Sequence, residues 1–146
     1  MAVNVDATQH VARYCSSQKI DRKVQPAEPM PFAFALREGK ETFLSVNHCE
    51  HHSGARLDQL RSILGDLTAK GYGWSKSGGF SVLNSGKVLE CGEARDRALR
   101  VRRRHHHLDR SYASIEGLPV DNSDSELLAL LATKGSVEFH LVADIP

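Results

Sequence analysis

The clearest pattern of apolar and polar positions lies at residues 54–71. Leu57, Leu60, Ile63, Leu64 and Leu67 recur there at three- and four-residue spacing, which is the period of one face of a helix. Gly71 follows the last of them and can act as a C-terminal cap. The pattern therefore predicts an amphipathic helix whose apolar stripe packs on a sheet.

Two further segments have helical spacing. At residues 6–17, Ala7, Val11 and Cys15 share a helical face, and Asp6 with Gln9 can form a weak capping box. At residues 123–135, Ser123 and Glu126 form a capping box in front of a leucine-rich stretch that ends at a glycine. Each segment is predicted to be a short helix.

Short runs of β-branched and aromatic residues, separated by turn signals, predict the strands. The predicted strands are residues 32–36, 42–48, 80–83, 88–91, 98–104, 112–115 and 136–142. The strands at residues 32–36 and 42–48 are close enough in sequence to form a hairpin. The strands at residues 80–83 and 88–91 can form a second one around the turn signal at residues 84–87. Residues 93–104 have a helical alternative, and residues 136–142 fit a sheet edge.

These elements predict an α+β fold, with one mostly antiparallel sheet of about 4–6 strands and two or three helices packed on one face. At 146 residues, the chain has the length of one domain. We expect residues 1–31 to form an N-terminal helix and a linker containing Pro26, Pro29 and Pro31, packed on an α+β core of residues 32–146.

Charge and cysteine content narrow the range of functions. The formal net charge is +1, from 19 basic and 18 acidic residues, so any attraction to nucleic acid must come from local clusters. The three cysteines are widely spaced and odd in number, which favours free thiols over disulfides or a structural zinc site. Without a signal-peptide pattern or an apolar stretch of membrane-spanning length, we expect a soluble cytoplasmic protein with no membrane contact.

The densest cluster of reactive side chains is at residues 45–52, where His48, Cys49, Glu50, His51 and His52 are consecutive. If this segment continues as a strand, His48, Glu50 and His52 share a face. If it forms a helical turn, His48 and His52 meet at i, i+4 spacing. In either case the cluster lies just before the longest predicted helix.

Two chemistries fit this cluster. His48 and His52, completed by a third histidine such as His10, His105, His107 or His140, are candidate zinc ligands, with Glu50 as a candidate general base. The spacing is not the H-E-x-x-H of zinc hydrolases. Cys49 is a candidate nucleophile if a nearby imidazole activates its thiol.

A second candidate site is the basic segment Arg95 to Arg110. As a strand, it would place Arg100, Arg102 and Arg104 in one row that can contact phosphates or an acidic protein. In the glycine-rich connection at residues 71–79, Trp74 or Tyr72 can pack on the core or contact a partner.

Three segments resemble a group of small uncharacterised bacterial proteins that carry a Ser-Val-Asn-x-x-Glu motif. They are Phe43-Leu-Ser-Val-Asn-His-Cys-Glu50, Phe80-Ser-Val-Leu83 and Ser111-Tyr-Ala-Ser-Ile-Glu-Gly-Leu-Pro119, within residues 40–133. In that pattern Trp and Leu stand where this chain has His48 and Cys49, and a histidine stands at Tyr112. The resemblance implies no activity, but it directs attention to Asn47 and Glu50.

Together, these features favour a cytoplasmic bacterial accessory or adaptor protein, with no catalysis and no cofactor of its own, that binds a protein or anionic partner. Its binding surface would comprise Asn47, His48, Glu50, His52, Trp74, Arg100, Arg102, Arg104 and Tyr112. One alternative is a small zinc-dependent hydrolase that uses His48, Glu50 and His52. The other is a nucleic-acid-binding module that uses residues 95–110.

Overall fold

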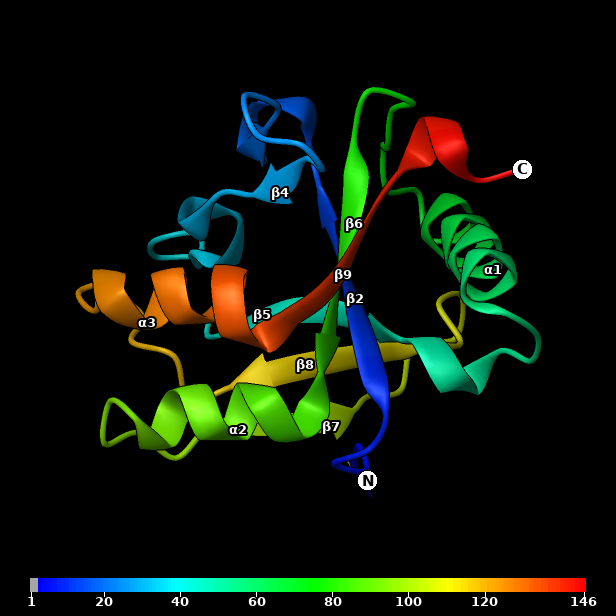
Figure 1. Ribbon diagram of the computed structural model, residues 1–146. Helices are drawn as coiled ribbons and strands as arrows, with labels where there is room; N and C mark the ends of the chain where they lie inside the picture. The colour runs from blue at the N-terminus through cyan, green and yellow to red at the C-terminus, as the bar shows by residue number, and fades with distance from the viewer. Residues whose placement is uncertain (1–2) are drawn as a thin grey trace.

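The protein is built around a seven-stranded antiparallel sheet. The computed structural model describes residues 3–146 (Figure 1). The strands of this sheet are β1 (Val3–Asn4), β2 (His10–Cys15), β5 (Phe43–His48), β6 (Gly79–Asn84), β7 (Arg100–Arg103), β8 (Tyr112–Glu116) and β9 (Ser136–Leu141). They lie in the order β1-β7-β8-β5-β2-β6-β9, and each neighbouring pair is antiparallel.

Helices cover both faces of this sheet. The α-helices are α1 (Arg56–Ala69), α2 (Ser85–Glu93) and α3 (Ser125–Leu130). Shorter helical turns are η1 (Ser17–Lys19), η2 (Pro31–Phe34), η3 (Cys49–His51), η4 (Leu131–Gly135) and η5 (Val142–Asp144). Figure 1 shows α1 on one side of the central strands and α2 with α3 on the other.

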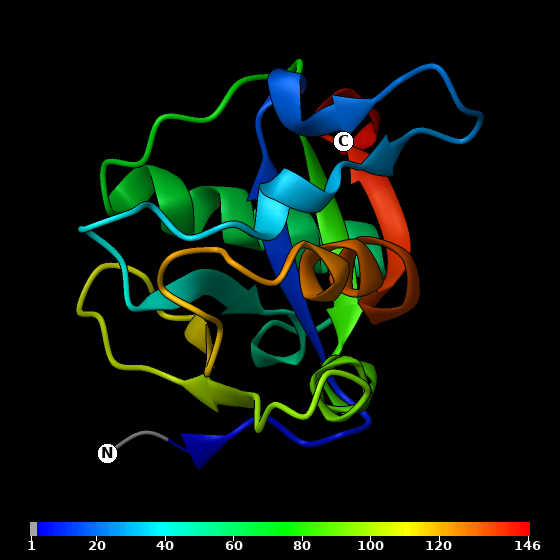
Figure 2. The same ribbon diagram turned by 90° about the vertical axis from the view of Figure 1, so that its left-hand side faces the viewer.

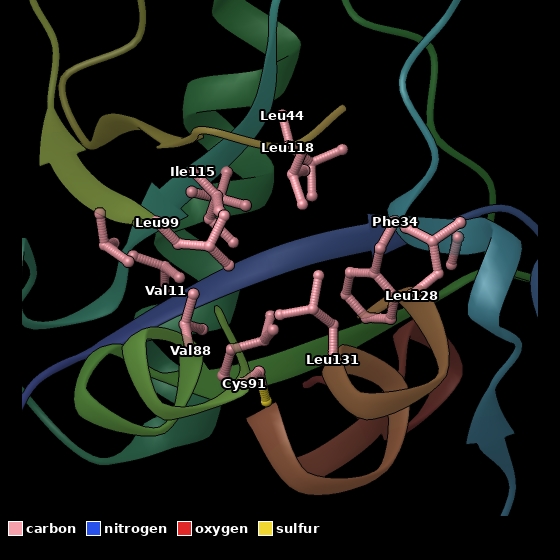
Figure 3. Packing of buried hydrophobic residues seen from close by; sticks show 14 of the residues in the cluster. Val11, Phe34, Leu44, Val88, Cys91, Leu99, Ile115, Leu118, Leu128 and Leu131 are labelled. Atoms are coloured by element: carbon pink, nitrogen blue, oxygen red, sulfur yellow. The ribbon is translucent and has the colours of Figure 1, made fainter. Parts of the chain in front are cut away.

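Two apolar cores result, because successive residues of a strand point to opposite faces. Ala12 packs with α1 residues such as Leu60 and Ile63. Its neighbour Val11 belongs to the larger core on the other face, together with side chains of α2, α3 and η2 (Figure 3). The predicted α+β class and antiparallel sheet are confirmed, but the sheet has seven strands rather than 4–6, and the helices do not lie on one face.

The helix predicted at residues 6–17 is wrong, since residues 10–15 form β2. This strand lies between β5 and β6, so apolar residues are needed on both of its faces. Val11 and Cys15 point to one core and Ala12 to the other, a distribution that resembles helical spacing when read along the sequence. The N-terminal segment is thus part of the main sheet.

The strand predicted at residues 88–91 is also wrong, because these residues lie in α2. Asn84 ends β6, and its side-chain oxygen accepts a hydrogen bond of 3.0 Å from the Lys87 amide, which caps the helix. The residues taken for a hairpin turn therefore begin a helix. The helix ends at Glu93. The strand predicted at residues 98–104 is confirmed, because residues 100–103 form β7.

Between β2 and β5 the chain differs from the prediction in two places. Residues 31–34 form the short helical turn η2 instead of a strand, because Pro31 provides no amide hydrogen for a strand partner. The proline-containing linker includes a small pair of strands, β3 (Ile20–Asp21) and β4 (Glu28–Pro29). Figure 2 shows η2, in cyan, close to β2.

The remaining predicted elements are confirmed. Helix α1 and strands β5, β6 and β8 lie where the patterns placed them, and β9 is an edge strand of the sheet. Helix α3 is capped one residue later than predicted, by Asp124, whose carboxylate accepts a 3.1 Å hydrogen bond from the Leu127 amide. In the range 3–146, none of the helices has the length and apolar character required to cross a bilayer. The predicted domain starts at Met1, which lies outside this range.

Candidate functional site

Strands β2 and β5 separate after only two residue pairs. They are paired at Val11 with His48 and at Ala12 with Asn47. Beyond this point β2 continues along β6 to Cys15, and β5 continues along β8 to Phe43. The sheet is therefore open between the outer halves of two central strands.

The side chain of Arg13 lies in this opening. Its Nη1 donates a 3.0 Å hydrogen bond to the carbonyl oxygen of Ser45 on β5. Its Nε donates a second, also 3.0 Å, to the carbonyl oxygen of Ala33 on η2. The guanidinium thus connects the two strands and η2 where ladder hydrogen bonds are missing.

A cavity of about 470 Å³ adjoins Arg13, and we call it the split pocket. Its lining comes from β2, η1, η2 and the segment after it, β5, and the C-terminal end of α1 with the residues that follow. The lining residues are Arg13, Tyr14, Lys19, Phe32, Ala35, Leu36, Arg37, Glu41, Ser45, Asn47, Leu67, Lys70 and Tyr72. The volume is within the range of about 300–1,000 Å³ that is common for small-molecule sites.

The lining of the split pocket has an excess of positive charge. Arg13, Lys19, Arg37 and Lys70 line it together with the carboxylate of Glu41, and Lys70 is paired with the buried Asp109 behind the wall. Within residues 3–146, Arg13 has no carboxylate at ion-pair distance, and its two hydrogen-bond partners are neutral carbonyls. Burial lowers the pKa of Arg13, and burial together with repulsion from Arg13 lowers the pKa of Lys19. An anion in this pocket would relieve that unfavourable electrostatic environment.

Asn47 anchors one wall of the pocket. Its Nδ2 donates to Oδ1 of Asp109 at 2.8 Å and to Oγ of Ser111 at 2.9 Å. Asp109 is fully buried, and its other oxygen lies 2.7 Å from Nζ of Lys70. The carboxylate of Asp109 thus fixes both the asparagine and a lysine that faces the pocket.

Asp66 of α1 extends this hydrogen-bond network. Its Oδ2 accepts a 2.6 Å hydrogen bond from Oγ of Ser111 and lies 2.7 Å from Nε2 of His52. Because Asp66 lies between the serine and the histidine, the imidazole is not in position to remove the serine proton directly. This order differs from the nucleophile-base-acid order of a catalytic triad.

Tyr112 contacts two residues that line the split pocket. Its hydroxyl is 3.2 Å from Oγ of Ser45, and Nζ of Lys70 lies 4.3 Å from the centre of its ring. The ring also contacts His106 edge to face. Tyr112 therefore contacts both the wall of the split pocket and the histidine-rich segment that precedes it in the chain.

Glu50 and His48 belong to a different network. The carboxylate of Glu50 accepts a 2.8 Å hydrogen bond from the His10 amide and lies 2.6 Å from Nδ1 of the same residue. Burial opposes ionisation of Glu50, but the hydrogen bonds from His10 outweigh it, so the pKa of Glu50 is lowered. Nε2 of His48 is 2.9 Å from Oε1 of Gln9, and burial, followed by repulsion from Arg103, lowers the pKa of His48.

The consecutive residues of the predicted cluster are therefore divided among three environments, and only His48 and Glu50 remain at ion-pair distance, 3.9 Å apart. Asn47 lines the split pocket, His48 and Glu50 contact Gln9 and His10, and His52 contacts Asp66. Across residues 3–146, no three histidine, cysteine or acidic side chains come together as metal ligands. The candidate ligands His105 and His107 line a pocket together with His51, and neither His48 nor His52 is part of its lining. Zinc binding remains a prediction from the sequence.

Cys49 is fully buried in the core beneath α1, with Leu60 and Phe80 in the same cluster. Burial raises the pKa of its thiol to about 12. A thiol in this setting has the properties of a small apolar core residue rather than those of a thiolate nucleophile.

The predicted arginine row is partly neutralised. Arg102 and Arg104 both pair with Glu116, at 3.5 Å and 3.0 Å. The guanidinium of Arg104 also stacks 3.7 Å from the ring centre of Phe43. Arg100 is exposed, and Arg103 donates a 2.8 Å hydrogen bond to His51. Arg95, at the other end of the basic segment, pairs with Asp124 and Glu126 near α3.

Trp74, another predicted binding residue, lies outside the split pocket. Its Nε1 donates a 2.9 Å hydrogen bond to Oγ1 of Thr68, and it lines a cavity between α1 and the C-terminal segment that includes Val142 and Ile145. Four cations of the split pocket, Arg13, Lys19, Arg37 and Lys70, were not singled out by the sequence patterns. The one available signal was a charged Arg13 within the apolar run from Val11 to Cys15.

Comparisons of this chain with protein-family models, with curated proteins and with solved structures gave no match. The assignment of a function therefore depends on the site itself.

Proposed function

We propose that this protein is a non-catalytic accessory or adaptor protein that recognises an anionic group in the split pocket. The observation that carries this proposal is the position of Arg13. Its guanidinium lies beside the cavity and is hydrogen-bonded only to main-chain carbonyls, with two further cations, Lys19 and Arg37, around it. Charge-assisted hydrogen bonds from arginine are strong and well suited to phosphate and carboxylate groups.

This proposal retains the anionic partner expected from the sequence but moves the main contact surface. Of the residues predicted to bind, Asn47 lines the pocket, and Tyr112 supports it through Lys70 and Ser45. Arg102 and Arg104 already interact with Glu116, so they have less capacity to attract an external anion. We also propose a cytosolic location, which the free thiols of Cys15, Cys49 and Cys91 support.

Calorimetric titration with inorganic phosphate tests the proposal directly. At an ionic strength of about 0.15 M, we expect saturable binding to the intact protein. Lys19→Met and Arg37→Gln should each weaken it roughly tenfold, since each removes a charged donor. Lys87→Met, which removes a lysine outside the pocket, is the matched control and should leave the affinity unchanged.

Two outcomes would overturn the proposal. One is the lack of saturable binding of phosphate at concentrations on the order of 10 mM. The other is binding with the same affinity in the Lys19→Met and Arg37→Gln variants, which would place the anion elsewhere. Circular dichroism of each variant would verify that it is folded.

A further inference from the structure

Two exposed aromatic rings lie at the split pocket. Phe32 is 46% exposed and Tyr72 is 43% exposed, and both line the cavity. Aromatic side chains left accessible beside a polar cavity offer flat apolar surfaces for a planar ligand group. The pocket therefore combines cations with aromatic surface. A simple inorganic anion would contact the cations but leave the aromatic rings without a partner.

Backbone hydrogen bonds at the end of α1 and a ring contact with Tyr14 fix the position of Tyr72. The Tyr72 amide donates a 2.9 Å hydrogen bond to the Leu67 carbonyl, and the Gly71 amide donates a 3.0 Å hydrogen bond to the Thr68 carbonyl. These two bonds and the positive φ of 83° at Gly71 form a Schellman motif at the end of α1. The tyrosine ring also contacts Tyr14 edge to face, with ring centres 5.8 Å apart.

The same helix end places a cation next to this ring. Lys70 is the C-terminal cap residue of α1, and its Nζ is fixed by the buried Asp109 at 2.7 Å. Phe32 lies in η2. The residue after it, Ala33, accepts a hydrogen bond from Arg13 through its carbonyl oxygen. Each exposed ring is thus connected by a short segment of chain to one of the cations that line the pocket.

We propose that the group recognised in the split pocket is a nucleoside phosphate, with its phosphate near Arg13, Lys19 and Arg37 and its base against Phe32 or Tyr72. This inference rests on the proposed anion-binding function and names its ligand class. Phosphate contacts with arginine and lysine combined with base stacking on aromatic rings are the usual means of binding nucleotides without reading their sequence. Both a free nucleotide and a nucleotide within a single strand offer this chemistry.

The test compares four ligands on the intact protein by calorimetry: inorganic phosphate, adenosine, adenosine 5′-monophosphate and a 5′-phosphorylated single-stranded oligonucleotide. We expect the monophosphate to bind at least tenfold more tightly than either phosphate or adenosine alone. Phe32→Leu or Tyr72→Leu should weaken binding of the monophosphate roughly 5- to 150-fold. Neither change should alter the affinity for inorganic phosphate. Leu108→Ala, at an exposed apolar residue outside the pocket, is the control.

Binding of the oligonucleotide that is tighter than that of the monophosphate would support the inference and identify a nucleic acid strand as the source. The reverse order would support it and identify a free nucleotide. Equal affinities for phosphate and monophosphate, unaffected by either leucine variant, would overturn the nucleotide assignment while leaving the anion-binding function in place. Failure of both phosphate and monophosphate to bind would overturn both.

Discussion

The guanidinium of Arg13 bridges the opening between β2 and β5, with its Nη1 atom 3.0 Å from the carbonyl oxygen of Ser45. Because β2 and β5 are no longer paired at this level, the arginine side chain takes the place of a ladder hydrogen bond. One residue therefore stabilises the separated strands and also supplies positive charge to the pocket that the separation creates.

The first prediction concerns this stabilising role. Arg13→Met should lower the free energy of unfolding by about 1.5–3 kcal/mol, because two carbonyls lose a charged hydrogen-bond donor. Urea denaturation monitored by circular dichroism measures this change. Arg37→Met, at an exposed arginine of the same pocket, should change the stability by less than about 0.5 kcal/mol. Equal stability of the two variants would show that the bridge contributes nothing.

Asn47 is predicted to be a structural support of the pocket wall. Asn47→Ala should lower the free energy of unfolding by about 2–4 kcal/mol, because it leaves Asp109 and Ser111, both fully buried, without their amide donor. Thermal and urea denaturation measure this decrease in the free energy of unfolding. The exposed Asn4 provides the matched change, Asn4→Ala, with an expected effect of less than about 0.5 kcal/mol. A similarly small effect at Asn47 would contradict the prediction.

The stability of the protein should fall as the pH drops below about 6.5, the ordinary pKa of histidine. Burial, followed by repulsion from Arg103, lowers the pKa of both His48 and His51. Between the lowered pKa values and the ordinary histidine value, the unfolded chain binds more protons than the folded protein, so acid favours unfolding. Below the ordinary glutamate value of about 4.3, protonation of Glu50, whose pKa is also lowered, should destabilise the fold further.

Urea denaturation at several pH values measures this dependence. A His48→Gln, His51→Gln double variant should lose part of the decrease in stability that occurs below about pH 6.5, the ordinary pKa of histidine. His107→Gln, at an exposed histidine, serves as the control. The histidine explanation fails if the double variant retains the full slope of the original protein.

The thiol of Cys49 should resist alkylation in the folded protein. With a pKa of about 12 and no exposed surface, it should react with iodoacetamide at about pH 8 on the order of 10³-fold more slowly than a free thiol. Mass spectrometry before and after addition of guanidinium chloride measures this difference. Ser77→Cys, at an exposed position, provides a reactive control. Rapid labelling of Cys49 in the native protein would instead support the nucleophile hypothesis.

Elemental analysis of tag-free protein tests the zinc-hydrolase alternative. Because His48 contacts Gln9 and His52 contacts Asp66, we expect less than one zinc ion per chain. The zinc content should not change in a His48→Ala, His52→Ala double variant. A full equivalent of zinc that is lost from this variant would favour the hydrolase over the binding function.

The sequence by itself determined the elements whose patterns are local. In α1, the spacing of the leucines forms a single apolar stripe that can be recognised within the helix itself. In β5 and β8, side chains of neighbouring residues alternate between the two faces of the sheet. These elements, the antiparallel α+β class and the edge position of β9 could be predicted. Strand β2 and helix α2 were misread because a central strand needs apolar residues on both faces and because Asn84 suits a helix cap as well as a turn.

Only the tertiary structure decided which polar residues meet. His48, Glu50 and His52 are near one another in the sequence, yet only His48 and Glu50 stay close in the fold, with Nε2 and Oε1 3.9 Å apart. The turn after β5 directs His52 to Asp66 instead. Arg37 and Lys70 are far in the sequence from Arg13 and Lys19 and from each other, yet all four cations line one cavity beside the opening between β2 and β5. Sequence proximity cannot reveal such a site, because its geometry depends on where two strands stop pairing.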